Sequence, residues 1–332
     1  MTLHSSPGAR NSVAEKAAPA RRPPPGRASA GPGGGSRRRS ARTWSSAGAF
    51  AAFVLPTLTV FTAVVLVPIL WTLYIGTTDE RATRRETSFV GLDNYRSLLE
   101  DDSFRHSLWN TVVITVIVVV LTNLLGIAIA LLLSRPGRLY SLLRSVYFTP
   151  VILSSVVVSV IGRSILADKG LLNSTLTSLG IENPPGWLTD PSFAIYSVSF
   201  VMVWQTLGFA VVVYLAGLAG IPVELDEAAS LDGAGPWQRF RAITWPMLAP
   251  ALTINTVMLM IGSFKVYDQI AVLTNGGPGT DGTATVAFDV VRTAFAEQRP
   301  GMASAMAGIM LAIVSVASVT TLRLLQRREV NL

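Results

Sequence analysis

Cysteine is absent from the 332-residue sequence, and lysine and histidine are nearly so, with three and two copies. Without cysteine the chain has no disulfide bonds, no thiol chemistry and no thiolate-bound metal. His4 and His106 each stand alone in a polar stretch, so a histidine metal site is not expected either. None of the three lysines follows a glycine, as the phosphate-binding loop of an ATPase requires. The chain also lacks a nucleophile–base pair and a carboxylate pair placed for acid–base chemistry, so we predict no enzyme activity, metal or cofactor.

Charged side chains are scarce as well. They make up 14% of the residues, against about 25% in a soluble domain, whereas hydrophobic residues make up 50%. The mean hydropathy is +0.48, and such a composition is typical of a membrane protein. The net charge of +7 comes from the first 43 residues, which hold nine Lys or Arg and one acid. Because the excess is confined to this segment, nucleic acid is not an expected partner.

Residues 1–43 are rich in Pro, Gly, Ser and Arg and cannot bury enough apolar surface to fold. We predict a disordered basic tail, held in the cytoplasm and in contact with anionic lipid. The apolar run that follows is longer than the hydrophobic region of a signal peptide, which has about 7–15 residues. The predicted division is a first membrane span with an extracytoplasmic loop over 44–108, a core of five spans over 109–326 and a second cytoplasmic tail over 327–332.

Six segments are apolar for about 20 residues, the length of a helix that crosses the hydrocarbon core. Backbone polar groups in lipid need partners within the same segment, and the alternation of β-barrel strands is absent, so each segment should be a helix. We predict an all-α integral membrane protein with six transmembrane helices, at residues 47–75, 109–133, 142–166, 193–218, 251–273 and 302–325.

The arginine distribution indicates which loops face the cytoplasm. The N-terminal tail, the loop that contains Arg135, Arg138 and Arg144, and the C-terminal end are all basic, as cytoplasmic segments usually are. Six spans with both termini in the cytoplasm satisfy all three. The loop 77–107 argues against this topology, because it would lie outside and holds five arginines. We keep the topology because the strongly basic N-terminal tail has the larger influence on orientation. The same topology puts residues 219–250 in the cytoplasm, after the fourth span.

The loop 219–250 has the pattern of two short helices joined by a tight bend. Pro222 suits a first helical turn, and the acids that follow it are favourable near the positive end of the helix dipole. Gly233 is a typical residue at a helix end. Pro246 should end the second helix before the fifth span. The loop is therefore expected to project from the membrane.

Both helices of this loop carry an apolar feature. Ala228 and Ala229 give the first helix a flat face that another backbone could approach closely. The second helix has one apolar stripe, because large residues recur every third position, at Trp237, Phe240 and Ile243. These patterns fit a loop that binds a partner and equally a loop that folds back on its own bundle at the lipid interface.

Polar residues inside predicted spans are candidates for a substrate path, because polar and charged groups are costly in the membrane. In the fourth span Gln205, Thr206 and Phe209 share one face, with Trp204 beside it. Amides and hydroxyls hydrogen-bond sugar hydroxyls, and aromatic rings stack on the apolar faces of sugars. Ordinary hydrogen bonding between helices is the alternative interpretation.

The fifth span contains the charged candidates. Lys265 and Asp268 lie three residues apart, so we expect them to share a helix face and to pair. Ser263 and Tyr267 lie beside them. The group could form a polar wall of a substrate cavity or could only order the packing of the helices, and the sequence leaves both open.

Residues 227–246 resemble the EAA motif of ABC importer permeases, which is Glu-Ala-Ala, three residues, Gly, nine residues, Ile, one residue and Leu-Pro. Trp245 stands where the motif has leucine, and the other positions match, at Glu227, Ala228, Ala229, Gly233, Ile243 and Pro246. The stretches FVGLDNYRSLL, LAGLAGIPVEL and LTNGGPGTDGTAT resemble the carbohydrate branch of these permeases, the relatives of maltose and glycerol-3-phosphate permeases. The resemblance covers residues 48–326.

This resemblance implies a type I ABC importer permease fold, in which the loop 219–250 is a cytoplasmic two-helix element that couples the permease to a separate ATPase. For the polar face of the fourth span, it implies alignment with the cavity-lining region of the maltose-type relatives. The residues implied in the contact with the ATPase are Glu227, Ala228, Ala229, Asp232, Gly233, Trp237, Phe240, Ile243 and Pro246.

The partners implied by the resemblance are a cytoplasmic ATPase dimer, a second homologous permease, an extracytoplasmic solute-binding protein and a carbohydrate substrate. The chain would form half of the translocation path in a bacterial cell membrane. A secondary, ion-coupled transporter is the alternative, but it would need mid-membrane carboxylates and internal repeats. Asp268 is the one acid inside a predicted span, and no repeat is evident. A structural membrane adaptor would leave the motif in the loop unexplained.

Overall fold

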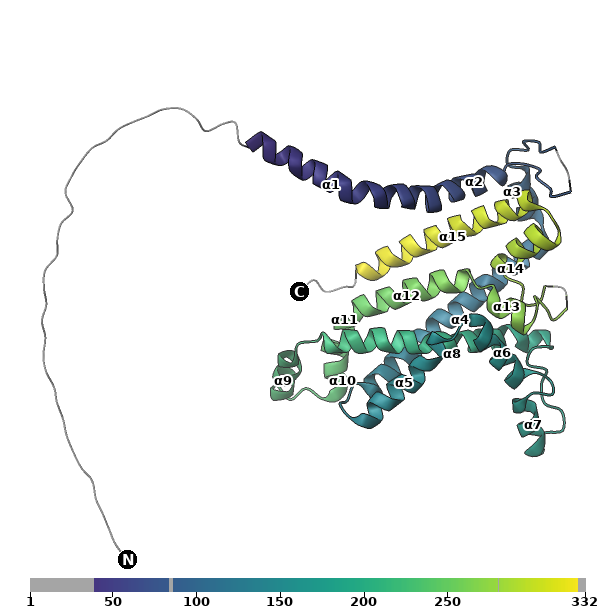
Figure 1. Ribbon diagram of the computed structural model, residues 1–332. Helices are drawn as coiled ribbons and strands as arrows, with labels where there is room; N and C mark the ends of the chain where they lie inside the picture. The colour runs from purple at the N-terminus through teal and green to yellow at the C-terminus, as the bar shows by residue number, and fades with distance from the viewer. Residues whose placement is uncertain (1–38, 84–85, 280, 328–332) are drawn as a thin grey trace, which may run out of the picture. The chain divides into compact units, whose positions relative to one another are not determined.

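The computed structural model describes the chain from Arg39 to Arg327, except for residues 84–85 and 280 (Figure 1). It consists of two units, Met1–Val60 and Phe61–Leu332, and each is described by itself. In the first unit, helix α1 begins at Arg39, and the rest of the predicted N-terminal tail lies outside the described residues.

Helices make up most of the described chain, and the all-α prediction is confirmed. In these residues one isolated β-bridge is present and no strand. With η for π-helical turns, the helices are α1 (Arg39–Phe61), η1 (Thr62–Leu66), α2 (Val67–Ile75), α3 (Asp93–Glu100), α4 (Asp102–Leu133), α5 (Arg138–Ile152), α6 (Ser155–Leu166), α7 (Leu171–Ser178), α8 (Pro191–Ala219), α9 (Val223–Leu231), α10 (Pro236–Arg239), η2 (Phe240–Thr244), α11 (Trp245–Met247), α12 (Ala249–Phe264), α13 (Asp268–Leu273), α14 (Val286–Val291), η3 (Arg292–Ala296) and α15 (Pro300–Gln326).

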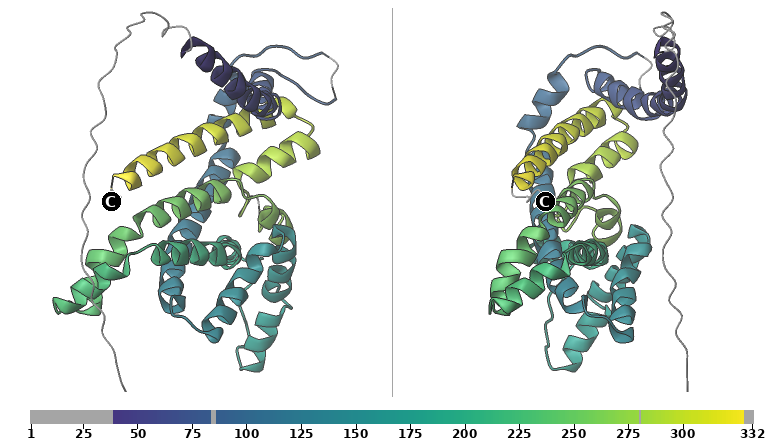
Figure 2. Two further views of the ribbon diagram at one scale, coloured as in Figure 1. Left: turned by 60° about the vertical axis from the view of Figure 1, so that its left-hand side comes forward. Right: turned by 90° about the vertical axis from the view of Figure 1, so that its left-hand side faces the viewer.

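In the second unit the helices lie side by side in the order α2, α15, α12, α8 and α5, and α4 crosses against α12 and α8 (Figures 1 and 2). Three buried apolar clusters in the described chain hold this arrangement together, and two of them surround α4 and α8. The first includes Val118, Val201 and Ile270, and the second includes Ile127 and Tyr214. α4 and α8 contribute to both clusters, so these two helices form the centre of the unit.

Four stretches of helix are long and apolar enough to cross a membrane, at Phe50–Ile75, Asp102–Leu133, Pro191–Ala219 and Pro300–Gln326. Two further spans are bent pairs of helices, and with them the described chain has up to six. The second span begins seven residues earlier than predicted. Asp101 caps it by accepting a hydrogen bond from the Ser103 backbone N–H at 2.8 Å.

The third predicted span is not one straight helix. The chain breaks between α5 and α6, and the path bends by 103° between Arg138–Ile152 and Ser155–Ser178. Leu153 is extended at the break, and Ser154 caps α6 by accepting from the Val157 N–H at 3.4 Å. This capping serine made the prediction of an uninterrupted helix wrong, because it provides a new helix start within the apolar run.

The fifth predicted span also breaks. α12 ends at Phe264 and α13 begins at Asp268, so the expectation that Lys265 and Asp268 share one helix face is wrong. Unpaired backbone groups at such depth need partners within the protein. Here the Thr285 hydroxyl donates to the Val266 carbonyl at 2.8 Å. Since Thr285 lies 19 residues further along the chain, no local pattern could have revealed the break.

The loop 219–250 forms the two predicted helical segments, α9 and the run α10–η2–α11. Gly233 makes the bend with φ of +77°, a backbone conformation that residues with a Cβ rarely adopt. Pro246, however, does not end the second segment, because it lies inside α11. The preceding π-helical turn and the first turn of α11 accommodate a residue that has no N–H to donate.

Candidate functional site

A cavity of about 480 Å³ lies where α8, α12 and α13 meet the break between α5 and α6. Seven of the eight residues proposed from the sequence for the substrate path line it, and Trp204 does not. Trp204 is partly exposed on α8 outside this cavity. The seven are Gln205, Thr206, Phe209, Ser263, Lys265, Tyr267 and Asp268.

A chain of side-chain amides crosses one wall of the cavity. Gln269 Nε2 donates to Gln205 Oε1 at 2.8 Å, and Gln205 Nε2 donates to Ser155 Oγ at 3.3 Å. The bonds fix both glutamines, which are buried, and join α13, α8 and α6. Gln269 and Ser155 did not emerge from the sequence, because both reach the cavity through helix breaks that it does not signal.

The two charged residues of the cavity lie on either side of the break after α12. Lys265 caps the end of α12, and Asp268 opens α13. No ion pair joins them, and neither side chain has a hydrogen-bond partner among the residues that the structure describes. An ammonium and a carboxylate are thus both free to meet a ligand in the cavity.

Aromatic rings supply part of the apolar lining of the cavity, which also includes Val151, Met202, Met258, Leu259 and Val266. Tyr267 stacks on Phe288, with ring centroids 6.2 Å apart and an interplanar angle of 24°. Phe209 contributes a second ring from α8. Fixed amides, one carboxylate, one ammonium and aromatic faces in one cavity suit a ligand that carries many hydroxyl groups on an apolar ring.

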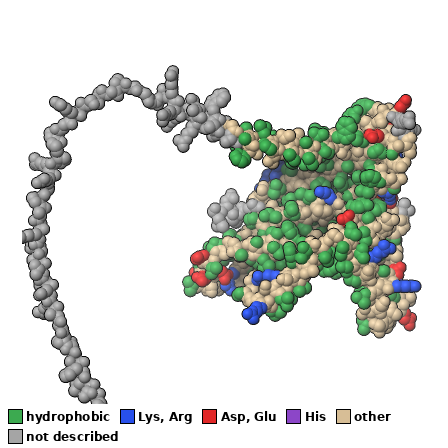
Figure 3. Space-filling model, viewed as in Figure 1, with side chains coloured by type: hydrophobic (Ala, Val, Ile, Leu, Met, Phe, Trp, Pro, Cys, Tyr) green, Lys and Arg blue, Asp and Glu red, His purple; other side chains and the backbone are tan. Residues whose placement is uncertain are grey.

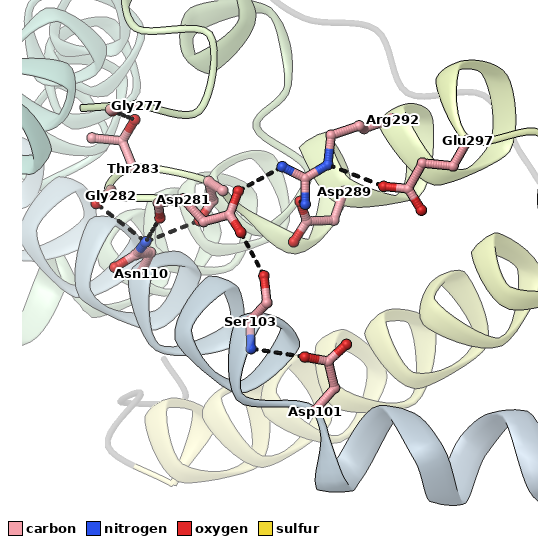
Figure 4. Close-up of polar contacts among 11 residues, drawn as sticks. Asp101, Ser103, Asn110, Gly277, Asp281, Gly282, Thr283, Asp289, Arg292 and Glu297 are labelled. Atoms are coloured by element: carbon pink, nitrogen blue, oxygen red, sulfur yellow. Dashed lines mark hydrogen bonds and ion pairs between the residues drawn. The ribbon is translucent and has the colours of Figure 1, made fainter. Parts of the chain in front are cut away.

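The segment between α13 and α14 ties the cavity wall to α4 (Figure 4). Asn110 of α4 donates to the carbonyl oxygens of Asp281, Gly282 and Ala284 at 3.2, 3.4 and 3.0 Å. Thr111 accepts from the Val286 N–H at 3.1 Å. These bonds hold the backbone that leads from the cavity toward α14.

Arg292 fastens the same segment from its other side (Figure 4). Its guanidinium bonds Asp281, lies 3.0 Å from the Asp289 carboxylate and 3.6 Å from Glu297. Burial opposes ionisation of Asp281, but hydrogen bonds from Arg292 and Ser103 outweigh it and hold its pKa below the usual range. Burial of Asp289 dominates over the charge of Arg292 and raises the pKa of Asp289 to about 6.

The loop 219–250 presents apolar side chains to its surroundings. Leu231 is 90% exposed and Trp237 71% exposed. The Trp237 and Phe240 rings stack at 5.5 Å, and an ion pair of 2.9 Å between Arg239 and Asp226 joins the second segment to α9. The loop is therefore internally braced, while Leu231 and most of the surface of Trp237 stay exposed.

The other residues proposed for contact with an ATPase lie on the same loop in two environments. Glu227, Ala228 and Asp232 are exposed, and Ala229, Phe240, Ile243 and Pro246 are partly buried. Hydrophobic side chains cover much of the face of the second unit seen in Figure 3, and acidic side chains gather over α9 and at the opposite end. An apolar middle between polar ends is what a bilayer requires.

Comparison with known proteins finds a family and similar sequences. The family of binding-protein-dependent transport system inner membrane components matches residues 122–330. The chain is 32% identical over 280 residues to the "Probable starch degradation products transport system permease protein AmyD" of Thermoanaerobacterium thermosulfurigenes, covering 84% of this chain and 94% of that protein. It is 32% identical over 302 residues to the diacetylchitobiose uptake system permease protein NgcF of Streptomyces coelicolor, covering 87% of this chain and 85% of that protein.

A solved structure shares the fold. It is a chain of a bacterial ABC transporter involved in the import of the acidic polysaccharide alginate, with a TM-score of 0.75 and 21% identity. The match covers 87% of this chain and 99% of that chain. The predicted type I importer permease fold is confirmed by this likeness.

The raised pKa of Asp289 makes stability depend on pH. Its folded-state pKa of about 6 lies above the ordinary value of 3.8, so its contribution favours the folded chain below pH 4 and is lost as pH rises through 6. The loss amounts to about 3 kcal/mol. We predict that Asp289→Asn flattens the fall in unfolding temperature of the detergent-solubilised chain between pH 4 and 7. Glu182→Gln, an exposed control, should show the same dependence of unfolding temperature on pH as the wild type. If wild type, Asp289→Asn and Glu182→Gln all show the same dependence, the assignment is contradicted.

Proposed function

The chain belongs to the family of binding-protein-dependent transport system inner membrane components, and we propose that it forms half of the path by which an ABC importer carries a carbohydrate across a bacterial cell membrane. Members of this family are transport permease subunits, and ATP hydrolysis falls to a separate chain. The cavity between α8, α12 and α13 is the observation that carries the proposal, because it joins amides, charges and aromatic rings in one place.

The proposed substrate class is a sugar or a related oligosaccharide. The cavity volume of about 480 Å³ lies within the usual range of ligand sites. In this proposal Asp268 accepts hydrogen bonds from hydroxyl groups, Lys265 and Gln205 donate to them, and Tyr267 packs on an apolar sugar face. The names of two relatives, which refer to starch degradation products and diacetylchitobiose, support the same class.

The proposed role of the loop 219–250 is mechanical. α9 would dock in a groove of a cytoplasmic ATPase, so that closure of an ATPase dimer moves the loop and the helices attached to it. Burial of Leu231 and Trp237 in that groove would remove apolar surface from water and stabilise the contact. The ion pair of Arg239 with Asp226 would keep the two segments of the loop moving as one body.

The proposed topology follows from the same assignment. Both termini and the loop 219–250 face the cytoplasm, and α3, α7 and α14 lie toward the outside. A second homologous permease completes the path within the lipid bilayer, and an extracytoplasmic solute-binding protein delivers the carbohydrate. The basic composition of the first 43 residues supports the cytoplasmic position of the N-terminus.

A test of the coupling contact uses the most exposed leucine of the loop. Leu231→Asp places a charge where the ATPase would bury an apolar side chain, and it should weaken association with the ATPase by about tenfold or more. Co-purification of the ATPase with the permease, at matched expression, measures this. Leu179→Asp, which changes a 75% exposed leucine outside the loop, is the control. Equal recovery of the ATPase with both variants would exclude the contact at Leu231.

A test of the cavity keeps the shape of Asp268 and removes its charge. Asp268→Asn should lower carbohydrate uptake by about tenfold or more, because hydrogen bonds to a charged acceptor are the stronger ones. Co-purification of the ATPase should not change, since the loop is untouched. Gln205→Leu should act in the same direction, and Asp93→Asn, an exposed carboxylate in α3, should have no effect. Wild-type uptake kinetics in both cavity variants would remove these residues from the substrate path.

A further inference from the structure

The short helix α13 follows the break in the fifth span and is held at both ends. Just before it, the Val266 carbonyl accepts from the Thr285 hydroxyl at 2.8 Å. Near its end, the Val272 carbonyl accepts from Arg163 of α6 at 3.3 Å. Between these two bonds, Ile270 is completely buried in the first apolar cluster. A helix fixed in this way gives its other side chains definite positions.

Gln269 carries the position of α13 into the cavity wall. Its side chain lines the cavity and is buried, as is the side chain of Gln205 on α8. Gln269 Nε2 donates to Gln205 Oε1 at 2.8 Å. Since the two residues come from separate helices, this bond ties the amide of Gln205 to the fixed helix α13.

The direction of this bond determines what Gln205 can offer to a ligand. A glutamine amide has one oxygen, which accepts hydrogen bonds, and two N–H groups, which donate them. The oxygen of Gln205 faces Gln269, and its nitrogen donates to Ser155 Oγ at 3.3 Å. The second N–H of Gln205 has no acceptor among the residues that the structure describes. Gln205 therefore keeps one N–H donor for a ligand.

Ser155 does not by itself select this orientation of the Gln205 amide. A hydroxyl donates as well as accepts, so Ser155 would bond equally well to the Gln205 oxygen if the amide were turned over. The N–H of Gln269 does select, because in the turned amide it would meet another N–H in place of an oxygen. A buried donor without an acceptor is unfavourable. Gln269 is thus the contact that distinguishes the two orientations of Gln205.

We propose that Gln269 is a positioning residue, which holds the Gln205 amide so that its free N–H is offered to an oxygen of the ligand. This part of the wall selects ligand groups that accept hydrogen bonds, such as hydroxyl and carbonyl oxygens. It disfavours an ammonium group, which can only donate. The inference rests on the proposed function in that it takes the cavity as the carbohydrate path, and it adds which polarity one wall of that path presents.

The first test is a double-mutant cycle on uptake of radiolabelled maltotriose by proteoliposomes that contain the assembled transporter and its binding protein. Gln269→Met keeps the length of the side chain and removes its N–H, and it should lower uptake about fivefold, the effect of one hydrogen bond. In a Gln205→Leu background the same change should have no further effect, because no amide remains to be oriented. Gln326→Met, at an exposed position, is the control and should not change uptake.

The second test reads the direction of the bond in the chain itself and needs no sugar. The side-chain amides of glutamine are labelled with ¹⁵N in the detergent-solubilised chain, and the Gln205 resonance is identified by its loss in Gln205→Leu. Ser155→Ala should shift this resonance more than Gln269→Met does, because the Gln205 nitrogen donates to Ser155. In a Gln269→Met background the shift caused by Ser155→Ala should be smaller, because the amide is no longer held in one orientation.

The proposal is overturned if the effects of Gln205→Leu and Gln269→Met on uptake multiply, because Gln269 would then act independently of Gln205. It is also overturned if the Gln205 resonance responds more to Gln269→Met than to Ser155→Ala, which would show the reversed orientation. If Gln269→Met does not assemble, Gln269→Glu, of equal size and without an N–H, takes its place with the same expectations. Wild-type uptake in Gln205→Leu would refute the proposed substrate role of Gln205, and the resonance would still decide whether Gln269 positions it. The resonance also decides if the wild type does not take up maltotriose.

Discussion

Backbone groups inside a bilayer must find hydrogen-bond partners within the protein, and this requirement determines where the chain can leave the helical path. Two apolar runs break, and at each break a hydroxyl supplies the missing partner. Ser154 caps the start of α6, and Thr285 donates to the carbonyl of Val266. The cavity lies between these two breaks and is lined by Ser155, Gln269 and Asp268 from their edges. The irregular backbone is therefore what brings polar side chains into the membrane interior.

The same principle links the cavity to its surroundings. The segment that satisfies Val266 is itself held by Asn110 and by the carboxylate cluster around Arg292, so one wall of the cavity is rigidly tied to α4 and η3. The opposite end of the second unit differs, because an ion pair joins α9 to α10, and Leu231 of α9 and Trp237 of α10 are exposed. A cavity wall tied to its neighbours and an exposed apolar loop fit the proposed division of roles between a permease and a separate ATPase.

Much of this arrangement is visible in the sequence, because it depends on local patterns. Apolar runs predicted the spans, Gly233 predicted the bend, and the spacing of Gln205, Thr206 and Phe209 predicted a shared face that does line a cavity. The break after α12 was not predictable, because its partner Thr285 lies 19 residues along the chain, and the pairing of Lys265 with Asp268 failed for that reason. The break before α6 has a local partner, the Ser154 cap, but a single serine inside an apolar run does not distinguish a helix start from a helix interior. Pro246 misled because a π-helical turn precedes the helix that contains it. Whether the residues of the cavity contact substrate stays a prediction.

The central claim is that ATP, through a separate subunit, drives carbohydrate through this chain. It is tested most directly by uptake of a radiolabelled oligosaccharide into proteoliposomes that contain the assembled transporter and its binding protein. Ionophores collapse the proton and sodium gradients, and ATP is supplied or withheld on the ATPase side. The account predicts that uptake continues with ionophores and stops without ATP. Uptake that stops with ionophores and continues without ATP would contradict it and would identify an ion-coupled transporter.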